Sequence, residues 1–132
     1  MRSITMLATP FFLVDDVAES IAYWRDSLGF YLRRSLGEPL EFAILQRNTV
    51  RVMLRRAPRW SQTIARSNSQ RAEDAIDLYI SVSDVSLLTA ELTTSGADVI
   101  QVPSLAEGRP ELLVRDPNGY VLCFGEEQHW PY

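Results

Sequence analysis

The sequence contains no lysine, because all 13 of its basic residues are arginine. Chemistry that begins with a Schiff base on a lysine amine is therefore excluded. The only cysteine, Cys123, cannot form an intramolecular disulfide. No apolar run reaches the roughly 18–20 residues that a membrane-spanning helix needs. We therefore expect a protein without disulfides and without a membrane partner.

Positive charge is also in the minority, with 13 basic against 17 acidic residues and a net charge of −4. Proteins that bind nucleic acid need a positive field, so we expect no nucleic-acid partner. The acidic balance is compatible with a cationic ligand. The only histidine, His129, stands near the C-terminus in a segment typical of a tail, and we interpret it as a surface group.

The chain has the length of one domain, at 132 residues, and 46% of these are apolar, as in ordinary globular proteins. The apolar segment Ile4–Val14 is followed by Asp15 and Asp16 and contains no small-residue cleavage site. We interpret it as a first strand and not as a signal peptide. The sequence thus predicts a single domain over residues 1–132, located in the cytoplasm.

A weak internal repeat divides the chain. The motif Val-Asp-Asp-Val at 14–17 recurs as Val-Ser-Asp-Val at 82–85. Each copy joins a strand-like apolar run to a segment with apolar residues at helical spacing. The two strand runs are Met6–Val14 and Leu78–Val82, and the two helix segments are Val17–Leu28 and Val85–Thr94.

The ends of both predicted helices carry suitable residues. Asp16 and Asp84 stand at the helix starts, where a carboxylate accepts hydrogen bonds from free amides. Gly29 and Gly96 follow the helices, as a left-handed C-terminal cap requires. Each predicted helix is therefore bounded on both sides.

Three short strands are predicted after each glycine, and a strong turn signal, residues 116–119, separates the last two strands of the second half. The corresponding turn of the first half is at residues 47–49. The predicted strands are Tyr31–Ser35, Glu41–Gln46, Val50–Arg55, Asp98–Val102, Glu111–Arg115 and Tyr120–Gly125. The order β-α-β-β-β thus occurs twice, over residues 4–56 and 74–126.

The connecting segment, residues 57–73, is the least regular part of the sequence. It is either a solvated linker or a loop that covers a ligand. Trp60 favours the second alternative, because its large side chain is costly to leave exposed on a solvated linker. We expect Trp60 to lie over a binding site while Arg59 and Arg66 stay in solvent; alternatively, Trp60 docks on its own helix or on a second subunit.

These motifs together resemble the vicinal oxygen chelate superfamily, which includes glyoxalases, bleomycin-resistance proteins and extradiol dioxygenases. The segments that carry the resemblance are Val14–Trp24, Leu28–Phe30, Leu78–Val85, Gly96-Ala97 and Glu111–Tyr120. The resemblance implies an α+β fold in which two βαβββ modules form an incomplete barrel around a concave cavity. Helices would lie outside this barrel, and a ligand would lie inside it.

Metal-dependent members of this superfamily place histidine or glutamate at four strand positions. By the resemblance these positions fall at Thr9, at Arg51 or Met53, at Asp77 and at Cys123. Threonine and methionine do not suit a hard divalent ion, and arginine repels any cation. Two remaining ligands are too few for an ordinary catalytic zinc site. We therefore expect no metal and no cofactor.

Strand alternation predicts which side chains face the cavity. Apolar and aromatic walls with a few polar groups are typical of a pocket for an organic ligand. Inward positions are predicted at Thr9, Phe11 and Leu13, at Glu41, Ala43 and Leu45, at Arg51, Met53 and Arg55, at Asp77, Tyr79 and Ser81, and at Glu111 and Leu113. The predicted ligand-binding residues are Thr9, Phe11, Arg51, Met53, Trp60, Asp77, Tyr79, Glu111 and Cys123.

Each of these residues also has a plainer interpretation. Arg51 and Asp77 could pair with each other, and Phe11 and Tyr79 could fill a closed core. We interpret Cys123 as a buried apolar residue, because no histidine is available to activate its thiol.

The resemblance favours a metal-free protein of the bleomycin-resistance type, which binds a small organic molecule, often an antibiotic, in grooves shared by two subunits. The alternative is a metal-independent enzyme, a lyase, isomerase or dioxygenase-like protein acting on a small metabolite, and a third is an interaction partner with a filled cavity. A homodimer is expected, with Trp24, Trp60 and Trp130 as aromatic surface for its interface.

Overall fold

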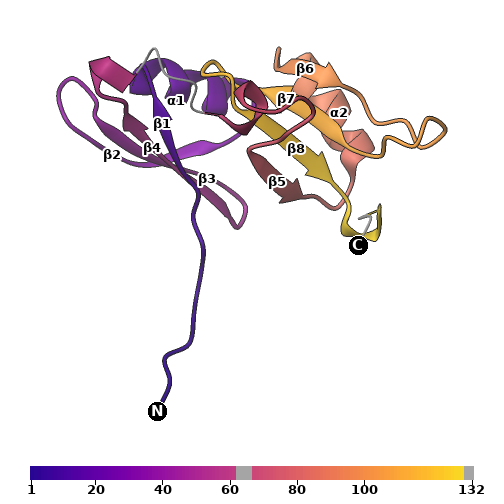
Figure 1. Cartoon of the computed structure of the whole chain (residues 1–132), viewed down its shortest axis with the longest axis horizontal. Helices are drawn as coiled ribbons and strands as arrows, with labels where there is room; N and C mark the ends of the chain where they lie inside the picture. Colours follow the sequence, from indigo (N-terminus) through magenta and orange to yellow (C-terminus); the bar gives the residue numbers. More distant parts are fainter. Residues whose placement is uncertain (62–66, 130–132) are drawn as a thin grey trace.

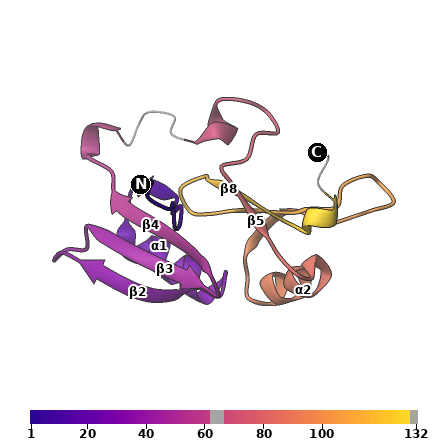
Figure 2. The same ribbon diagram turned by 90° about the horizontal axis from the view of Figure 1, so that it is seen from below.

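The computed structural model describes residues 1–61 and 67–129, so Arg66 and Trp130 lie outside the described residues. Two similar units lie side by side, and an N-terminal arm projects from one of them (Figure 1). Turned by 90°, the two units again lie side by side, the first in purple and the second in pink to yellow (Figure 2).

The first module contains a four-stranded sheet with the strand order β1-β4-β3-β2. Strand β1 is parallel to β4, and the other pairs are antiparallel. A parallel pair requires a crossover, which here is supplied by α1 and two strands. The elements are β1 (Phe11–Val14), α1 (Val17–Asp26), β2 (Tyr31–Leu36), β3 (Phe42–Arg47) and β4 (Val50–Arg56).

The second module repeats this topology with the strand order β5-β8-β7-β6. Its elements are β5 (Leu78–Ser81), α2 (Val85–Thr94), β6 (Asp98–Gln101), β7 (Leu112–Arg115) and β8 (Val121–Gly125). Short 3₁₀ turns are found at Arg59–Ser61, Asn68–Gln70 and Glu127–His129. The predicted double βαβββ order is confirmed, and the two sheets stay separate and do not close into a barrel.

Both predicted helix starts are confirmed, and α2 ends at Thr94 as predicted, whereas α1 ends at Asp26, two residues before the predicted Leu28. A side-chain oxygen of Asp16 accepts a hydrogen bond from the Glu19 amide at 3.1 Å, and Asp84 accepts one from the Leu87 amide at 2.9 Å. After the helices, Gly29 and Gly96 adopt φ angles of 77° and 81°. A side chain at either position would be strained, which explains why glycine ends both helices.

One face of each sheet packs against its helix and forms the core. In β4, Val52 and Leu54 are fully buried there, whereas Arg51 and Met53 are only half-buried on the other side. The predicted alternation of β4 is therefore confirmed. We call the opposite side of each sheet, turned away from its helix, the open face.

The predicted alternation of β3 is wrong. Ala43 lies opposite Leu54, and Leu45 lies opposite Val52, so both point toward the helix and are fully buried. Phe42–Leu45 is a continuous apolar run, and alternation cannot fix its register. Glu41, also predicted to face inward, precedes β3 and forms an ion pair with Arg56 at 2.5 Å.

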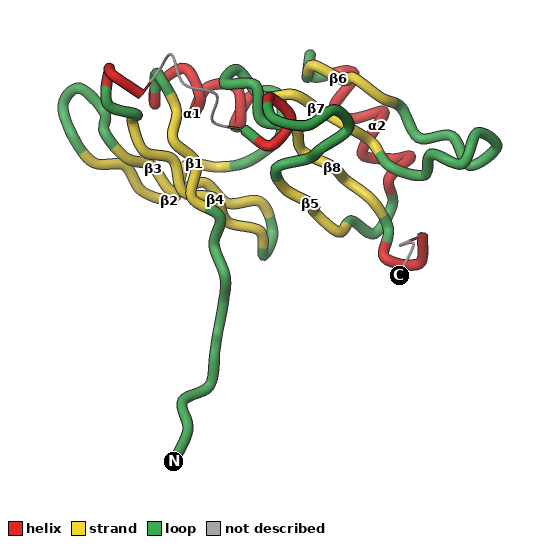
Figure 3. Tube along the Cα trace, viewed as in Figure 1, coloured by secondary structure: helices red, strands yellow, loops and turns green. Residues whose placement is uncertain are grey.

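Two further predictions need correction. Trp24 is fully buried and packs edge-on against Phe30, with ring centroids 4.9 Å apart, so it offers no surface to a partner. The predicted strand from Met6 begins only at Phe11 (Figure 3). Pro10 has no amide hydrogen to extend the ladder, and residues 1–10 form the extended N-terminal arm, where Met6 is exposed.

Tyr23 of α1 connects the two modules. Its hydroxyl donates a hydrogen bond to the Arg115 carbonyl at 2.8 Å and accepts one from the Asp98 amide at 2.9 Å. Burial raises the pKa of Tyr23, and the nearby charges of Asp98 and Asp116 act in the same direction, while the amide hydrogen bond opposes them. The side chain of one module thus binds two backbone groups of the other.

The predicted turn at 116–119 also connects the modules. The Asn118 side chain accepts a hydrogen bond from the Asp15 amide at 3.0 Å. Tyr120 directly follows this turn, and its ring stacks on Phe12 with centroids 4.5 Å apart. Its hydroxyl donates a hydrogen bond to the Leu13 carbonyl at 2.7 Å. The beginning of the first module is therefore held against the last hairpin of the second.

No helix in the described ranges is long and apolar enough to cross a membrane.

Candidate functional site

The open face of the first module carries apolar side chains edged by arginines. Residues paired directly across neighbouring strands point to the same face of a sheet. Phe11 lies beside Met53, and Met53 lies opposite Ile44. By this register the open face comprises Phe11, Leu13, Tyr31, Arg34, Leu36, Phe42, Ile44, Gln46, Arg51, Met53 and Arg55. The structure thus brings together Phe11, Arg51 and Met53, as the sequence predicts.

Arg51 is held by Gln46, its partner across the β3–β4 ladder. The Oε1 atom of Gln46 accepts a hydrogen bond from Arg51 Nε at 3.0 Å and another from Arg33 Nη1 at 2.9 Å. The Nε2 atom of Gln46 donates to the Asn48 carbonyl at 2.6 Å. This last bond fixes the orientation of the amide, so that its oxygen faces both arginines.

Asp77 does not pair with Arg51. One carboxylate oxygen of Asp77 accepts a hydrogen bond from the Asn68 amide at 2.6 Å, and the other accepts one from the Val121 amide at 2.8 Å. Asp77 therefore joins the connecting segment to the end of the second sheet. Its position in the site is fixed by these backbone contacts.

A cleft of about 490 Å³ lies beside Phe11, between β1 and the connecting segment. Trp60 stands at this cleft and is 74% exposed, and Phe11 is 51% exposed. The cleft is lined by Phe11, Phe12, Leu13, Trp60, Ser61, Asn68, Asp77 and Tyr120. Three predicted ligand-binding residues, Phe11, Trp60 and Asp77, thus share one cavity.

The other predicted residues gather on the open face of the second module. Tyr79 of β5 and Leu113 of β7 both pair with Cys123 of β8, from its two sides. A Cβ atom added to Gly125 would collide with the Tyr79 hydroxyl and would lie 3.3 Å from Glu111 Cγ. Tyr79 and Glu111 therefore converge over Gly125, on a different sheet from Phe11 and Arg51.

Cys123 is not an activated nucleophile. Burial, with a smaller contribution from the charge of Glu111, raises the pKa of its thiol to about 12. The thiol is therefore neutral at physiological pH, and only a thiolate attacks or binds a metal readily. The interpretation of Cys123 as a buried apolar residue agrees with its 4% exposure.

The four positions that the resemblance assigns to metal ligands do not offer a suitable donor set here. Thr9 lies in the extended arm before β1, and both oxygens of Asp77 already accept amide hydrogen bonds. At the second position Arg51 brings a positive charge and the alternative, Met53, only a soft thioether, and Cys123 is a neutral thiol. In the part of the chain that the structure describes, no three His, Cys, Asp or Glu side chains are grouped so as to hold a metal ion.

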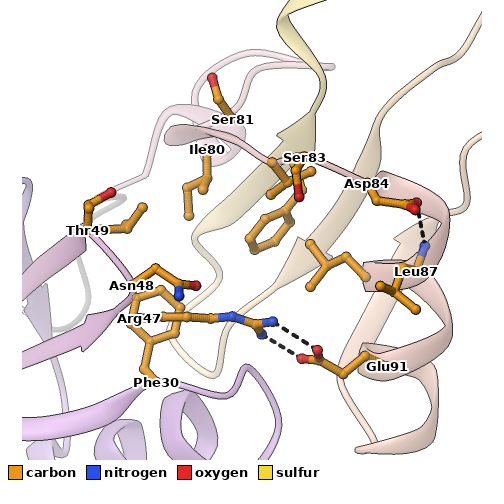
Figure 4. A pocket seen from close by; sticks show the side chains of 14 residues that line it. Phe30, Arg47, Asn48, Thr49, Ile80, Ser81, Ser83, Asp84, Leu87 and Glu91 are labelled. Atoms are coloured by element: carbon orange, nitrogen blue, oxygen red, sulfur yellow. Dashed lines mark hydrogen bonds and ion pairs between the residues drawn. The ribbon is translucent and has the colours of Figure 1, made fainter.

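A second cavity, of about 240 Å³, lies between the modules (Figure 4). Arg47 and Glu91 form a two-point ion pair at its edge, with nitrogen–oxygen distances of 2.5 and 2.8 Å. Arg47 also donates to the Leu28 carbonyl at 2.9 Å. This cavity was not predicted from the sequence, because nothing in the pattern links the end of β3 to the exposed side of the distant helix α2.

Two βαβββ modules with this strand order define the vicinal oxygen chelate class of proteins. Within that class, the family model of the glyoxalase-like domain matches residues 11–125, so the chain belongs to that family. No curated protein sequence matches the chain significantly.

Several solved structures share the fold. The bleomycin-binding protein from bleomycin-producing Streptomyces verticillus, solved with copper(II)-bleomycin, has a TM-score of 0.69 at 23% identity, over 94% of this chain and 98% of its own. TioX from Micromonospora sp. ML1 has a TM-score of 0.65 at 22% identity, over 90% and 94% of the two chains. A glyoxalase-related enzyme from Fulvimarina pelagi has a TM-score of 0.66 at 14% identity, over 97% and 92%.

Proposed function

We propose that this protein binds a small organic molecule, with antibiotics among the candidate ligands, and does so without a metal ion. The observation that carries this proposal is the cleft between Phe11 and Trp60. Two large aromatic side chains are exposed there beside a cavity of about 490 Å³, which is the size of a small-molecule site. Exposed aromatic rings at a cleft can bury their surface and stack when a flat ligand binds, which stabilises the complex.

The bleomycin-binding protein of Streptomyces verticillus supports the binding of a small organic molecule, since it shares the fold and was solved with copper(II)-bleomycin. The proposal that no metal ion is required rests on the donor atoms of this chain. Asp77 is engaged by two amides and Cys123 is neutral, so ligand recognition is assigned to aromatic stacking and polar side chains.

A thermal-shift screen of small organic compounds, run with and without EDTA, tests this function. We expect at least one class of flat compounds to raise the melting temperature equally in both conditions, because ligands stabilise the state that binds them. Stabilisation that disappears with EDTA would contradict the metal-free part of the proposal. If no compound acts, the result favours the alternative of an interaction partner with a filled, inert cavity.

Trp60 supplies the second test. Replacing Trp60 by alanine should weaken a compound found in the screen about tenfold, equivalent to ~1.4 kcal/mol, by removing the stacking surface. The melting temperature should hardly change, because the indole is 74% exposed. The matched control is Leu105→Ala, which removes another exposed apolar side chain, on the β6–β7 hairpin. A sharp fall in melting temperature with unchanged affinity would make Trp60 structural.

The proposal also includes a cytoplasmic location and a homodimeric state. The N-terminal arm supports it, because Ile4, Met6 and Leu7 are exposed on an extended segment that projects from the body (Figure 1). Such an arm gains by packing on a second copy. Light scattering should report about twice the 15.0 kDa chain mass. Deleting residues 1–8 should shift this mass toward the monomer, whereas a monomeric full-length chain would contradict the dimer.

Tyr79 and Glu111 favour a second candidate function. Both lie over Gly125, and a tyrosine hydroxyl and a carboxylate are groups that can transfer protons. This arrangement supports a metal-independent enzyme such as a lyase or isomerase. Turnover of a metabolite in the presence of EDTA, abolished by Tyr79→Phe, would favour this function over simple binding.

A further inference from the structure

Two arginine side chains meet on the open face of the first module without a carboxylate between them. Arg33 and Arg51 both donate to the same neutral acceptor, Gln46 Oε1, at 2.9 and 3.0 Å. Their donor nitrogens are therefore close neighbours. A neutral amide can orient two guanidinium groups, but it does not compensate their charge.

The surroundings do not neutralise this pair. In the described ranges, the ion pairs connect Arg25, Arg47, Arg56 and Arg109 to acidic residues. Arg33 and Arg51 are not among them. The strand positions of this open face carry no aspartate or glutamate, whereas Arg34 and Arg55 lie on it as well. The face is therefore basic, although the chain as a whole carries a net charge of −4.

The arginine pair borders the apolar part of the same face. Along β4, Arg51 is followed two residues later by Met53, which lies opposite Ile44 and beside Phe11. Two residues along a strand span ~7 Å, and the neighbouring strand lies ~5 Å further across. The guanidinium groups meet at Gln46 on β3, however, which is two strand spacings from β1, so a rigid body of roughly 12 Å would reach from them to the Phe11 ring.

We propose that the ligand of this site is an organic anion, in which a carboxylate, phosphate or sulfonate group is bound by Arg33 and Arg51 and a flat apolar body covers Ile44, Met53 and Phe11. This inference rests on the proposed small-molecule function and names its ligand class. Guanidinium groups bind such anions through paired, charge-assisted hydrogen bonds. Arg51 is half-buried, which strengthens its attraction for an anion relative to open water. The net charge of the whole chain is compatible with a cationic ligand, but the arginine pair at this site favours an anionic one.

Two fluorescent probes that differ in one charge test the inference. 8-Anilinonaphthalene-1-sulfonate carries a sulfonate on a flat naphthalene body, and N-phenyl-1-naphthylamine has the same body without it. Fluorescence titration of the intact chain should show the sulfonate binding at least tenfold more tightly. This preference should shrink as salt is added, because salt screens the charges.

Substitutions of the two arginines test whether they cause the preference for the sulfonate. Arg51→Gln and Arg33→Gln should each weaken the sulfonate about fivefold or more and leave the neutral probe unchanged. Arg109→Gln is the matched control, since it removes the same charge on a distant hairpin and should affect neither probe. Melting curves accompany every titration, because this sulfonate also binds partly unfolded proteins. Arg33 is exposed, so its variant is expected to fold even if the Arg51 variant does not.

The possible results distinguish a failure of the anion inference from a failure of the proposed small-molecule function. Equal binding of both probes, or sulfonate binding that the Arg33 and Arg51 variants do not weaken, overturns the anion inference and leaves small-molecule binding intact. Binding of neither probe, together with a screen that finds no compound, overturns both.

Discussion

The replacement of Tyr23 by phenylalanine tests how the two modules are held together. The change keeps the ring and removes only the hydroxyl, which donates to the Arg115 carbonyl at 2.8 Å and accepts from the Asp98 amide at 2.9 Å. Both backbone groups belong to the second module, whereas Tyr23 belongs to the first. The variant therefore weakens the contact between modules and leaves each sheet unchanged.

The expected loss follows from these two hydrogen bonds. A buried polar group without its partner costs ~1–3 kcal/mol, but Asp98 and Arg115 are exposed enough for water to replace part of each bond. We therefore expect Tyr23→Phe to lower the free energy of unfolding by ~1–2 kcal/mol. For a chain of this size the melting temperature should fall by roughly 3–6 °C.

Urea unfolding followed by tryptophan fluorescence measures this loss. Tyr31→Phe is the matched control, because Tyr31 is half exposed on β2, and it should change stability by less than about 0.5 kcal/mol. A loss for Tyr23→Phe as small as that of the control would refute the reasoning, because water would then replace the hydroxyl without cost.

The pH dependence of stability gives an independent check on Tyr23. Burial raises the pKa of its hydroxyl above the ordinary value of 10.0. Ionisation is thus less favourable in the folded protein than in the unfolded chain. The stabilisation by Tyr23 is fully present below pH 10.0 and is lost as the pH rises through the folded value. Between pH 10.0 and the folded pKa, the wild-type chain should therefore lose stability faster than Tyr23→Phe.

Three further changes have definite expected outcomes. Asp77→Asn should lower the free energy of unfolding in urea by ~1–2 kcal/mol, because one of two amide hydrogen bonds loses its acceptor, whereas Glu73→Gln on the exposed connection should not. Cys123, with a thiol pKa of about 12, should react with iodoacetamide at pH 7.5 at least ~100-fold more slowly in the folded protein than in urea, and a similar rate in both states would contradict its burial. Gly125→Ala should destabilise the protein by ~1–3 kcal/mol and displace Tyr79 in a crystal structure, since the added methyl group collides with the hydroxyl; an unchanged Tyr79 would refute this contact.

The fold was largely predictable from the sequence, because its signals are local. The aspartates at the helix starts, the glycines at the helix ends and the turn at 116–119 each act within a few residues of their own position. The face of β3 was not predictable. Phe42–Leu45 contains no polar residue, and only the pairing with β4 decides that Ala43 and Leu45 are buried.

The candidate site was predictable only in part, since its contacts join distant residues. Alternation was enough to place Phe11, Arg51 and Met53 on one face. It could not show that Gln46 orients two arginines, because Arg33 reaches it from a strand with an irregular register. Nor could it show that both oxygens of Asp77 are taken by amides of the connection and of β8. Those contacts depend on the tertiary arrangement of the two sheets.

Several hydrogen bonds between the modules constrain only one residue of each pair. Tyr23 binds a carbonyl and an amide of the backbone, Tyr120 binds the Leu13 carbonyl, and Ser95 binds the Ser27 carbonyl at 2.6 Å. Every residue supplies a carbonyl, whatever its side chain. The partner positions can therefore mutate freely without breaking these bonds. Through such one-sided constraints, two modules with the same topology can differ almost completely in sequence and still keep their relative orientation.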